Sequence, residues 1–286
     1  MSTEDCPITY ENPPIVEVAI STQFEPPRGL TQAHLGAYWA DCRRDYPQVH
    51  ATQVLPATTE EFGGRRTWLP PSLRLALTDE PDSRIQMTSE DSTWMLQVQS
   101  NRIVVNWRRK ADLSDPYPRF TGTWQRFENA WEHWCRFLAT AKIPAPQPTH
   151  WEIVYVNRIG KGTLWNKPTD WPSVLPGLWG HGFADIPGTT LMGLHGQWVW
   201  ETTNPPTRLF IEPKPGRGPA PRSDDFLFLN ITARGKIDLS PSGESSDDSC
   251  LLGIENGIKA GRRLIVNAFD QIISQKAKAE WKRHGD

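Results

Sequence analysis

Residues 122–160, GTWQRFENAWEHWCRFLATAKIPAPQPTHWEIVYVNRIG, contain a helix pattern, a break and a strand pattern in direct succession. Apolar side chains in the first part recur every three or four residues, which predicts an amphipathic helix with one apolar stripe. The stripe consists of Trp124, Phe127, Trp131, Trp134 and Leu138. The prolines of KIPAPQP (142–148) then stop the helix, because proline lacks an amide N–H and restricts the residue before it.

The order of elements is similar on the two sides of this break. Each side begins with a strand, continues with a helical stretch and several short strands, and ends with a long helix. The first side has strands at 13–27, 52–56, 72–77, 84–89, 93–99 and 102–108, and a first helix at 31–47. The second has strands at 150–160, 190–203, 207–213 and 224–238, a poorly helical stretch at 169–183 and a last helix at 250–284.

This order predicts an α+β fold of two similar α/β half-repeats, residues 1–148 and 149–286. Each half is expected to be a mostly antiparallel sheet with a long helix packed on one face, because each apolar helix stripe must be covered. The strands would form either two sheets or one long curved sheet. The alternative is a single α+β domain whose halves are alike by coincidence. Gly257 and Gly261 weaken the last helix and indicate a bend or close packing there.

Composition excludes several classes of protein. The chain has 286 residues, is 37% hydrophobic and carries a formal net charge of −2, which argues against a general nucleic-acid binder. The cysteines are widely spaced and form no C-x-x-C pair, so we expect no zinc site. The beginning of the chain has no apolar core of a signal peptide, and no stretch is long enough to span a bilayer. We therefore expect a cytoplasmic protein without membrane contact.

Known catalytic and cofactor motifs are missing from the sequence. It has no G-x-x-x-x-G-K-[ST] phosphate loop, no G-x-S-x-G nucleophile turn and no H-E-x-x-H metal pattern. Pairs of carboxylates lie in turns or before the last helix, where the helix dipole accounts for them. We therefore assign no catalytic residue, no metal ligand and no cofactor.

Several stretches resemble a sporadically distributed bacterial protein family of unknown function. The N-terminal ENPPIVEVAISTQF (11–24) matches its N-x-P-I-V-E motif, and NRIVVNWRRK (101–110), WEIVYVNRI (151–159) and the last helix (257–281) are similar to its later parts. Residues 259–263 are more basic than the family pattern. The resemblance implies no catalytic residues. It implies a patchy distribution, as in phage-defence or toxin–antitoxin loci.

Cations gather where two strands end. Arg108, Arg109 and Lys110 end the strand at 102–108, and Arg158 and Lys161 end the strand at 150–160. A charge run at a strand end is either a solvated rim or an anion-binding patch, and the sequence leaves both interpretations open.

Four polar residues interrupt strands that should be largely buried. Glu17 and Asn157 occupy like positions on the first strand of each half, and Asn106 and Asn230 form a second pair on later strands. Buried polar groups need partners. These residues therefore either join strand ends or face solvent across an open sheet, or they line a polar seam on the concave face.

These observations favour a non-catalytic binding or interaction protein. Another protein, encoded nearby, is the first-ranked partner. One alternative is a nucleic-acid-binding protein that uses the basic strand-end patch. Another is an enzyme whose catalytic residues are scattered and form no motif, and a small-ligand pocket between helix and sheet is a third. The candidate binding residues are Arg108, Arg109, Lys110, Arg158, Lys161, Glu17, Asn106, Asn157 and Asn230.

Overall fold

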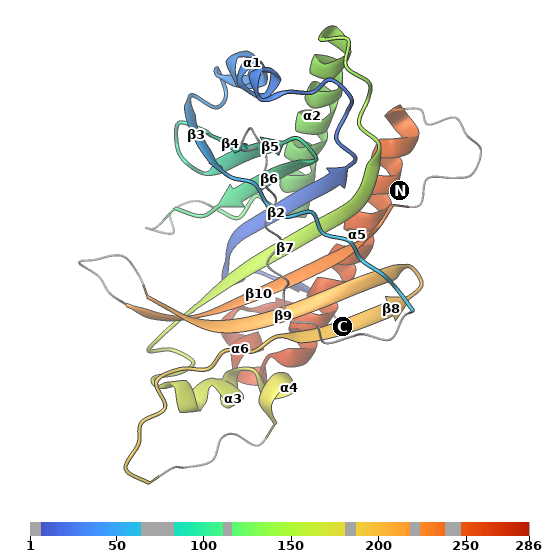
Figure 1. Cartoon of the computed structure of the whole chain (residues 1–286). Coiled ribbons are helices and arrows are strands. Elements are labelled where there is room, and N and C mark those ends of the chain that lie inside the picture. Colours follow the sequence, from blue (N-terminus) through green and yellow to red (C-terminus); the bar gives the residue numbers. More distant parts are fainter. Residues whose placement is uncertain are drawn as a thin grey trace.

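The computed structural model describes residues 7–63, 83–110, 116–180, 187–217, 224–237 and 247–285. Within them, nine strands form one antiparallel sheet in the order β3-β4-β5-β6-β2-β7-β10-β9-β8 (Figure 1). The strands are β2 (Ile15–Phe24), β3 (Gln48–Gln53), β4 (Ser83–Thr88), β5 (Trp94–Gln99), β6 (Arg102–Arg108), β7 (Pro148–Gly160), β8 (Trp198–Thr203), β9 (Pro206–Arg217) and β10 (Asp225–Lys236). The α+β class is confirmed, and one sheet continues across the break at 142–148.

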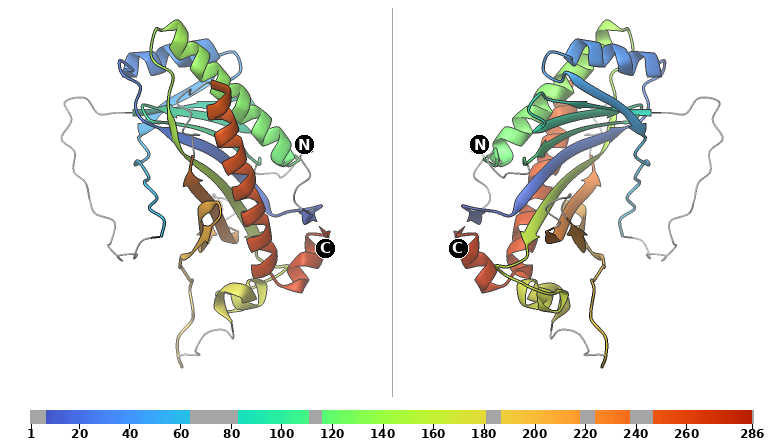
Figure 2. Two further views of the ribbon diagram at one scale, coloured as in Figure 1. Left: turned by 90° about the vertical axis from the view of Figure 1, so that its right-hand side faces the viewer. Right: turned by 90° about the vertical axis from the view of Figure 1, so that its left-hand side faces the viewer.

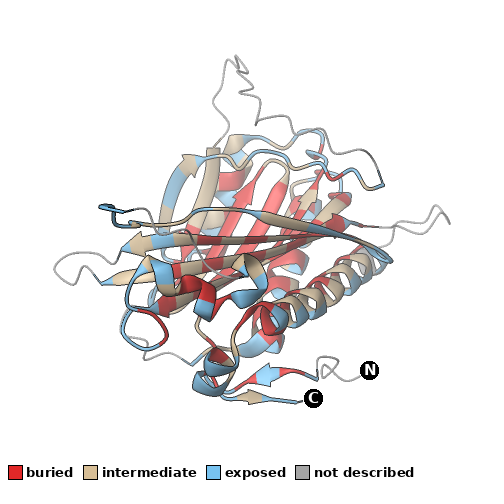
Figure 3. Cartoon of the chain, turned by 90° about the horizontal axis from the view of Figure 1, so that it is seen from below, coloured by how far each residue is buried: buried red, intermediate tan, exposed pale blue. Residues whose placement is uncertain are grey.

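Both long helices cover the same face of the sheet (Figure 2). Helix α2 (Arg119–Thr140) packs on β6 and β2, and α5 (Asp247–Ile272) packs on β7, β10 and β9. A third helix, α1 (Gln32–Cys42), contacts β4. Seen from below, buried residues concentrate on the strands and on the inner sides of these helices (Figure 3). The apolar core therefore lies in the layer between sheet and helices.

The predicted apolar stripe of the first long helix is confirmed. All five of its side chains are buried, and Trp134 and Leu138 are completely inaccessible. Tyr38 of α1 packs against Trp134 edge to face, with 4.9 Å between the ring centroids. The stripe therefore binds α2 to the sheet and α1 to α2.

Some predicted elements have other bounds. The strand expected at 190–203 is limited to β8, because Gly193 and Gly196 interrupt the stretch before it. The stretch expected to be poorly helical at 169–183 is described only as far as residue 180, and there it forms three short helices, η1 (Pro168–Asp170), α3 (Trp171–Val174) and α4 (Pro176–Trp179). The strand expected at 72–77 lies outside the described residues, and the strand expected at 52–56 ends at Gln53.

The last helix is interrupted near its end. After Ile272, Ser274 caps a separate helix α6 (Gln275–Glu280) by accepting a hydrogen bond from the Ala277 amide. Strand β11 (Arg283–His284) then pairs with β1 (Thr9–Tyr10).

Buried Asp270 fixes the two chain ends near each other. It accepts hydrogen bonds from Tyr10, Lys278 and Arg283. Burial acts to raise the pKa of this carboxyl, but the three donors outweigh burial and lower the pKa to about 2.

Glycines let α5 approach the sheet over Trp151. This side chain of β7 is 2% exposed, and its ring lies against Gly235 of β10 and against Gly257 and Gly261 of α5. A Cβ atom at Gly257 would lie 2.3 Å from the ring, and one at Gly261 would lie 2.5 Å from it. The prediction of close packing at these two glycines is confirmed.

The variant Gly257→Ala should therefore lower the free energy of unfolding by about 1–3 kcal/mol, as overpacking does. Alanine is the better helix former, so the clash with Trp151 must outweigh a propensity gain of about 1 kcal/mol. Gly36→Ala in α1 is the matched control, because nothing lies within 4 Å of its Cβ position. Denaturant unfolding measures both variants, and equal stabilisation by the two substitutions would contradict the packing of Trp151.

Candidate functional site

The sheet face opposite the helices is polar. Strand alternation places Gln97, Asn106, Glu17 and Arg234 on this face. The segment 54–63 crosses it, from the β5 side to the β8 side, and runs in front of the strands in Figure 1. Figure 2 shows this segment and the helices on opposite sides of the sheet. We call this surface the polar face.

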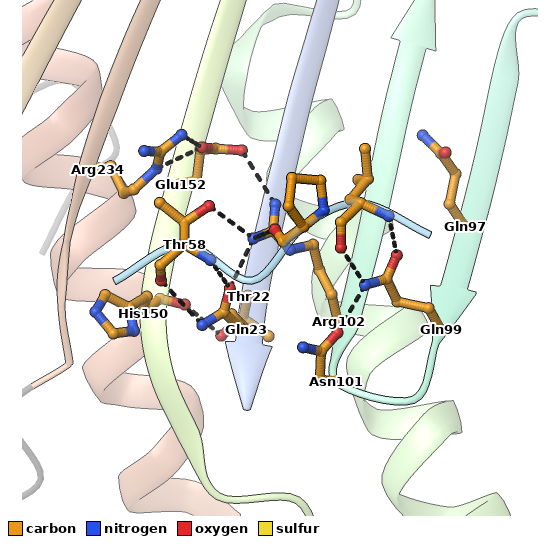
Figure 4. A network of polar contacts seen from close by, with 12 residues as sticks. Thr22, Gln23, Thr58, Gln97, Gln99, Asn101, Arg102, His150, Glu152 and Arg234 are labelled. Atoms are coloured by element: carbon orange, nitrogen blue, oxygen red, sulfur yellow. Dashed lines mark hydrogen bonds and ion pairs between the residues drawn. The ribbon is translucent and has the colours of Figure 1, made fainter. Parts of the chain in front are cut away.

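Side chains of β5, β6 and β2 hold the first part of the crossing segment (Figure 4). The Gln99 amide group donates to the Leu55 carbonyl and accepts from the Leu55 N–H, both at 2.9 Å. Gln23 makes the same two-way contact with the backbone of Thr58, at 2.8 and 3.0 Å. Arg102 donates to the Gln23 side chain at 2.7 Å and to the Thr58 hydroxyl at 3.1 Å. These side chains supply the hydrogen bonds that a neighbouring strand would otherwise supply to the backbone of the crossing segment.

Charges hold the second part of the crossing segment. Glu60 is 5% exposed and pairs with Arg208 at 3.3 Å and with Arg234 at 2.9 Å. Arg234 also donates to Glu152 at 2.6 Å, and Arg208 donates to Glu201 at 2.6 Å. Burial acts to lower the pKa of Arg234, but the two carboxylates outweigh burial and raise it. At the covered end, the charges of Arg208 and Arg234 are therefore paired with carboxylates of the chain itself.

The other end of the polar face is not crossed by this segment and carries a chain of amides. Gln86 donates to Gln97 at 3.0 Å, Gln97 donates to Asn106 at 2.6 Å, and Asn106 donates to Glu17 at 2.6 Å. Each amide therefore donates its N–H to the next side chain in the series. In such a series each hydrogen bond polarises the next one and strengthens it. We call the region around Asn106 and Glu17 the open end.

Glu17 is a carboxyl in an unfavourable place for charge. Burial raises its pKa, while the hydrogen bond from Asn106 and the charge of Arg108 act in the opposite direction. Arg108 is the backbone partner of Glu17 across β6 and β2. Its Nε is buried and has no hydrogen-bond partner among the described residues.

Cations from two strands meet at the open end. Arg158 of β7 faces the same side as Arg108, and its guanidinium lies 4.8 Å from the ring centroid of Phe226. Burial lowers the pKa of Arg158, and the nearby charge of Arg109 lowers it further. The structure therefore places Arg108 beside Glu17 and Arg109 near Arg158.

The other predicted cations lie apart from this group. Lys161 pairs with Asp225 at 3.5 Å, and both side chains are partly exposed. Lys110 is close enough to Asp91 for its charge to help lower the pKa of that carboxyl. Lys110 therefore lies near the turn between β4 and β5 as well as near the open end.

The other two predicted asparagines, Asn230 and Asn157, differ in the face that they occupy. Asn230 lies on the polar face, and its Oδ1 is buried without a hydrogen-bond partner among the described residues. Asn157 lies on the helix face, where it is 3% exposed and donates to the Leu229 carbonyl at 3.1 Å. A β-bulge between Ile15 and Glu17 reverses the faces of β2, so Glu17 and Asn157 do not line one seam.

A cysteine, a histidine and an aspartate meet between α1 and α2, which sequence reasoning missed. Cys42 Sγ lies 3.5 Å from His133 Nδ1, and His133 Nε2 lies 2.8 Å from an Asp41 oxygen. The order resembles a nucleophile, a base and an orienting acid. Burial, however, raises the pKa of Cys42 to about 11, and the charges of Asp41 and Asp45 add to it. The thiol stays protonated at neutral pH, so the cluster joins the two helices.

Two comparisons supply no relative from which a role could be transferred. Neither the models of protein families nor the curated proteins give a match to this chain. Among the described residues, no group of three His, Cys, Asp or Glu side chains is placed to hold a metal ion. No helix in that part of the chain has the length and apolar character to cross a membrane.

The variant Glu60→Gln should lower the free energy of unfolding by about 1–3 kcal/mol, because Arg208 and Arg234 lose their shared carboxylate and keep only Glu201 and Glu152 as partners. The neighbouring Glu61→Gln is the matched control, because that side chain is exposed and substitution there shifts stability by less than about 0.5 kcal/mol. Denaturant unfolding at neutral pH measures both. Equal stability of the two variants would refute the structural role of the Glu60 pairs.

The variant Glu17→Gln should change how stability depends on pH. Because the folded protein holds the Glu17 proton more tightly than the unfolded chain does, this carboxyl destabilises the wild type progressively as pH rises through its raised pKa. The variant keeps an acceptor for the Asn106 amide, but it has no carboxyl at this position whose ionisation could destabilise the folded protein. Its stability relative to the wild type should therefore rise from well below pH 4.5 to neutral pH, as measured by thermal unfolding in a pH series. A constant or falling difference would contradict the environment described for Glu17.

Proposed function

We propose that this chain is a non-catalytic binding protein and that the open end of its polar face contacts an acidic segment of a partner protein. The supporting observation is that Arg108 and Arg158 lie on the strands that flank the half-buried Glu17 carboxyl, on the same face of the sheet. Arginine forms two-pronged contacts with carboxylates and keeps its charge when partly buried. Arg108, Arg109 and Arg158 are all partly exposed, so their guanidinium groups can be reached from solvent.

The charge pattern favours a protein over a nucleic acid. A phosphate backbone demands several cations in a row, because affinity grows with each neutralised phosphate. The open end instead mixes arginines with Glu17 and with Glu212, which lies on the same face opposite Asn230. The formal net charge of −2 provides no long-range attraction for nucleic acid. A partner segment with a few separated carboxylates matches this mixture better.

The two-half organisation is part of the same proposal. The first strand of each predicted half, β2 or β7, lies at the sheet centre, and the last strand of each half, β6 or β10, lies beside it. This shared order supports an origin by duplication of segments 1–148 and 149–286. Such a duplication would give the protein two related strand ends that open toward one surface.

The resemblance to the sporadically distributed bacterial family extends the proposal to a biological setting. We place the protein in the cytoplasm, in a phage-defence or toxin–antitoxin type system with a neighbouring gene product as partner. The thiol state of Cys42, Cys135 and Cys250 is compatible with a reducing compartment.

The double variant Arg108→Gln, Arg158→Gln should weaken binding of a fluorescent peptide of alternating glutamate and tyrosine by about tenfold or more, equivalent to about 1.4 kcal/mol. Arg43→Gln, Arg44→Gln is the matched control, because it removes the same charge from an exposed helix end. Fluorescence anisotropy at low and moderate salt measures all three proteins.

Equal affinity of the double variant and the wild type, or no binding of the peptide at low salt, would contradict the proposal. Single-stranded DNA and RNA of matched length are measured beside the peptide. Tighter binding of either nucleic acid, lost in the double variant, would favour the nucleic-acid alternative.

A further inference from the structure

A cavity of about 460 Å³ lies at the end of the sheet, away from the crossing segment. The β9–β10 hairpin forms one wall, and residues 161–171 with 190–192 form the others. In Figure 1 these parts meet above α3, below the sheet. Pockets for small molecules commonly have volumes of about 300–1,000 Å³, so the cavity has room for one small organic molecule.

The floor of the cavity is aromatic and fixed. Trp165 and Trp171 are both nearly inaccessible and pack edge to face with 5.6 Å between their centroids. The Trp165 indole donates to the Ile159 carbonyl at 3.1 Å, which holds its orientation. The Trp171 Nε1 is buried and has no hydrogen-bond partner among the described residues. Phe226 completes the floor.

The rim of the cavity is cationic. Lys161, Lys167 and Arg217 line it, together with a single carboxylate, Asp225. Asp225 lies 3.5 Å from Lys161 and 3.5 Å from Arg217, and both cations remain largely exposed to solvent. These surface pairs are weak, because solvent screens them. An anionic ligand group therefore competes for the two cations at little cost.

Met192 lines the cavity and is itself exposed. This methionine is 82% accessible to solvent, beside Leu191 in the same wall. A large exposed apolar side chain beside an aromatic floor is typical of a binding site, since methionine adapts its shape to a ligand.

We propose that this cavity binds a small planar aromatic molecule that carries an anionic group. The ring would lie against the partly exposed Phe226, above the buried Trp165 and Trp171, where aromatic contact and apolar burial stabilise it. The anionic group would lie at the rim, between Lys161 and Arg217. This site adjoins the proposed protein contact at Phe226, whose ring also contacts Arg158, but none of Arg108, Arg109 and Arg158 lines the cavity.

Isothermal titration calorimetry with two anions and their neutral counterparts tests this proposal. The anions are indole-3-acetate and adenosine 5′-monophosphate, which carry a carboxylate and a phosphate, and the counterparts are indole and adenosine. At least one anion should bind with a dissociation constant below about 1 mM, and its neutral counterpart should bind about tenfold more weakly. The anion that binds identifies which acidic group the rim prefers.

Two variants separate the cavity from non-specific binding. Lys161→Gln, Arg217→Gln should weaken the bound anion about tenfold or more, whereas Arg28→Gln, Lys236→Gln, which removes the same charge at exposed positions, should not. Thr190→Trp places a large ring in the mouth of the cavity from its exposed wall and should abolish binding. Thermal unfolding confirms that each variant folds.

Failure of both anions to bind at millimolar concentration would overturn the proposal. Binding that survives both the paired rim substitution and Thr190→Trp would also overturn it, because the ligand would then lie elsewhere. Equal affinity for an anion and its neutral counterpart would remove the role of the cationic rim.

Discussion

A buried charge must have a partner, and the arginines of the polar face meet this requirement by holding a segment of their own chain. Arg234 and Arg208 share the carboxylate of Glu60, and Arg102 binds backbone and side chains at the other end of the segment. Removing one partner from such a pair leaves a buried charge and costs more than the pair itself contributes. The sheet is therefore covered on one face by apolar helices and on part of the other by a polar crossing segment.

This division leaves the open end as the part of the polar face that a partner can reach. There the amide chain ends on Glu17, and Arg108 and Arg158 stand on either side of it. The groups are held by strands, so little ordering is needed when a ligand binds. A few arginines fixed in this way match a few carboxylates on a partner, and the covered end keeps the rest of the face out of the contact.

The spacing of apolar residues in the sequence predicted most helices and strands. It did not predict the contacts between residues that are far apart in the sequence. The stripe of α2 and the strands β2, β6, β7 and β10 were accessible from the sequence, because burial leaves a regular spacing. Segment 54–63 has no periodicity, since its partners are side chains up to 174 residues away, as for Glu60 and Arg234. The β-bulge beside Glu17 places this side chain on the sheet face opposite to the one that simple strand alternation from Ile15 would give, and such a bulge cannot be predicted from alternation alone. The contact between Cys42 and His133 joins two helices, and these two residues are 91 positions apart in the sequence.

Photo-crosslinking of an acidic peptide to the wild-type protein locates the surface that the peptide contacts. A glutamate-rich peptide with a benzoylphenylalanine in its middle is bound at low salt and irradiated, and the cross-linked sites are mapped by mass spectrometry. Binding at the open end predicts cross-links to 104–110, 154–160 and 226–230, the strand segments that form the open end. Cross-links confined to the outer surfaces of α2 and α5, or to the crossing segment 54–63, would contradict it.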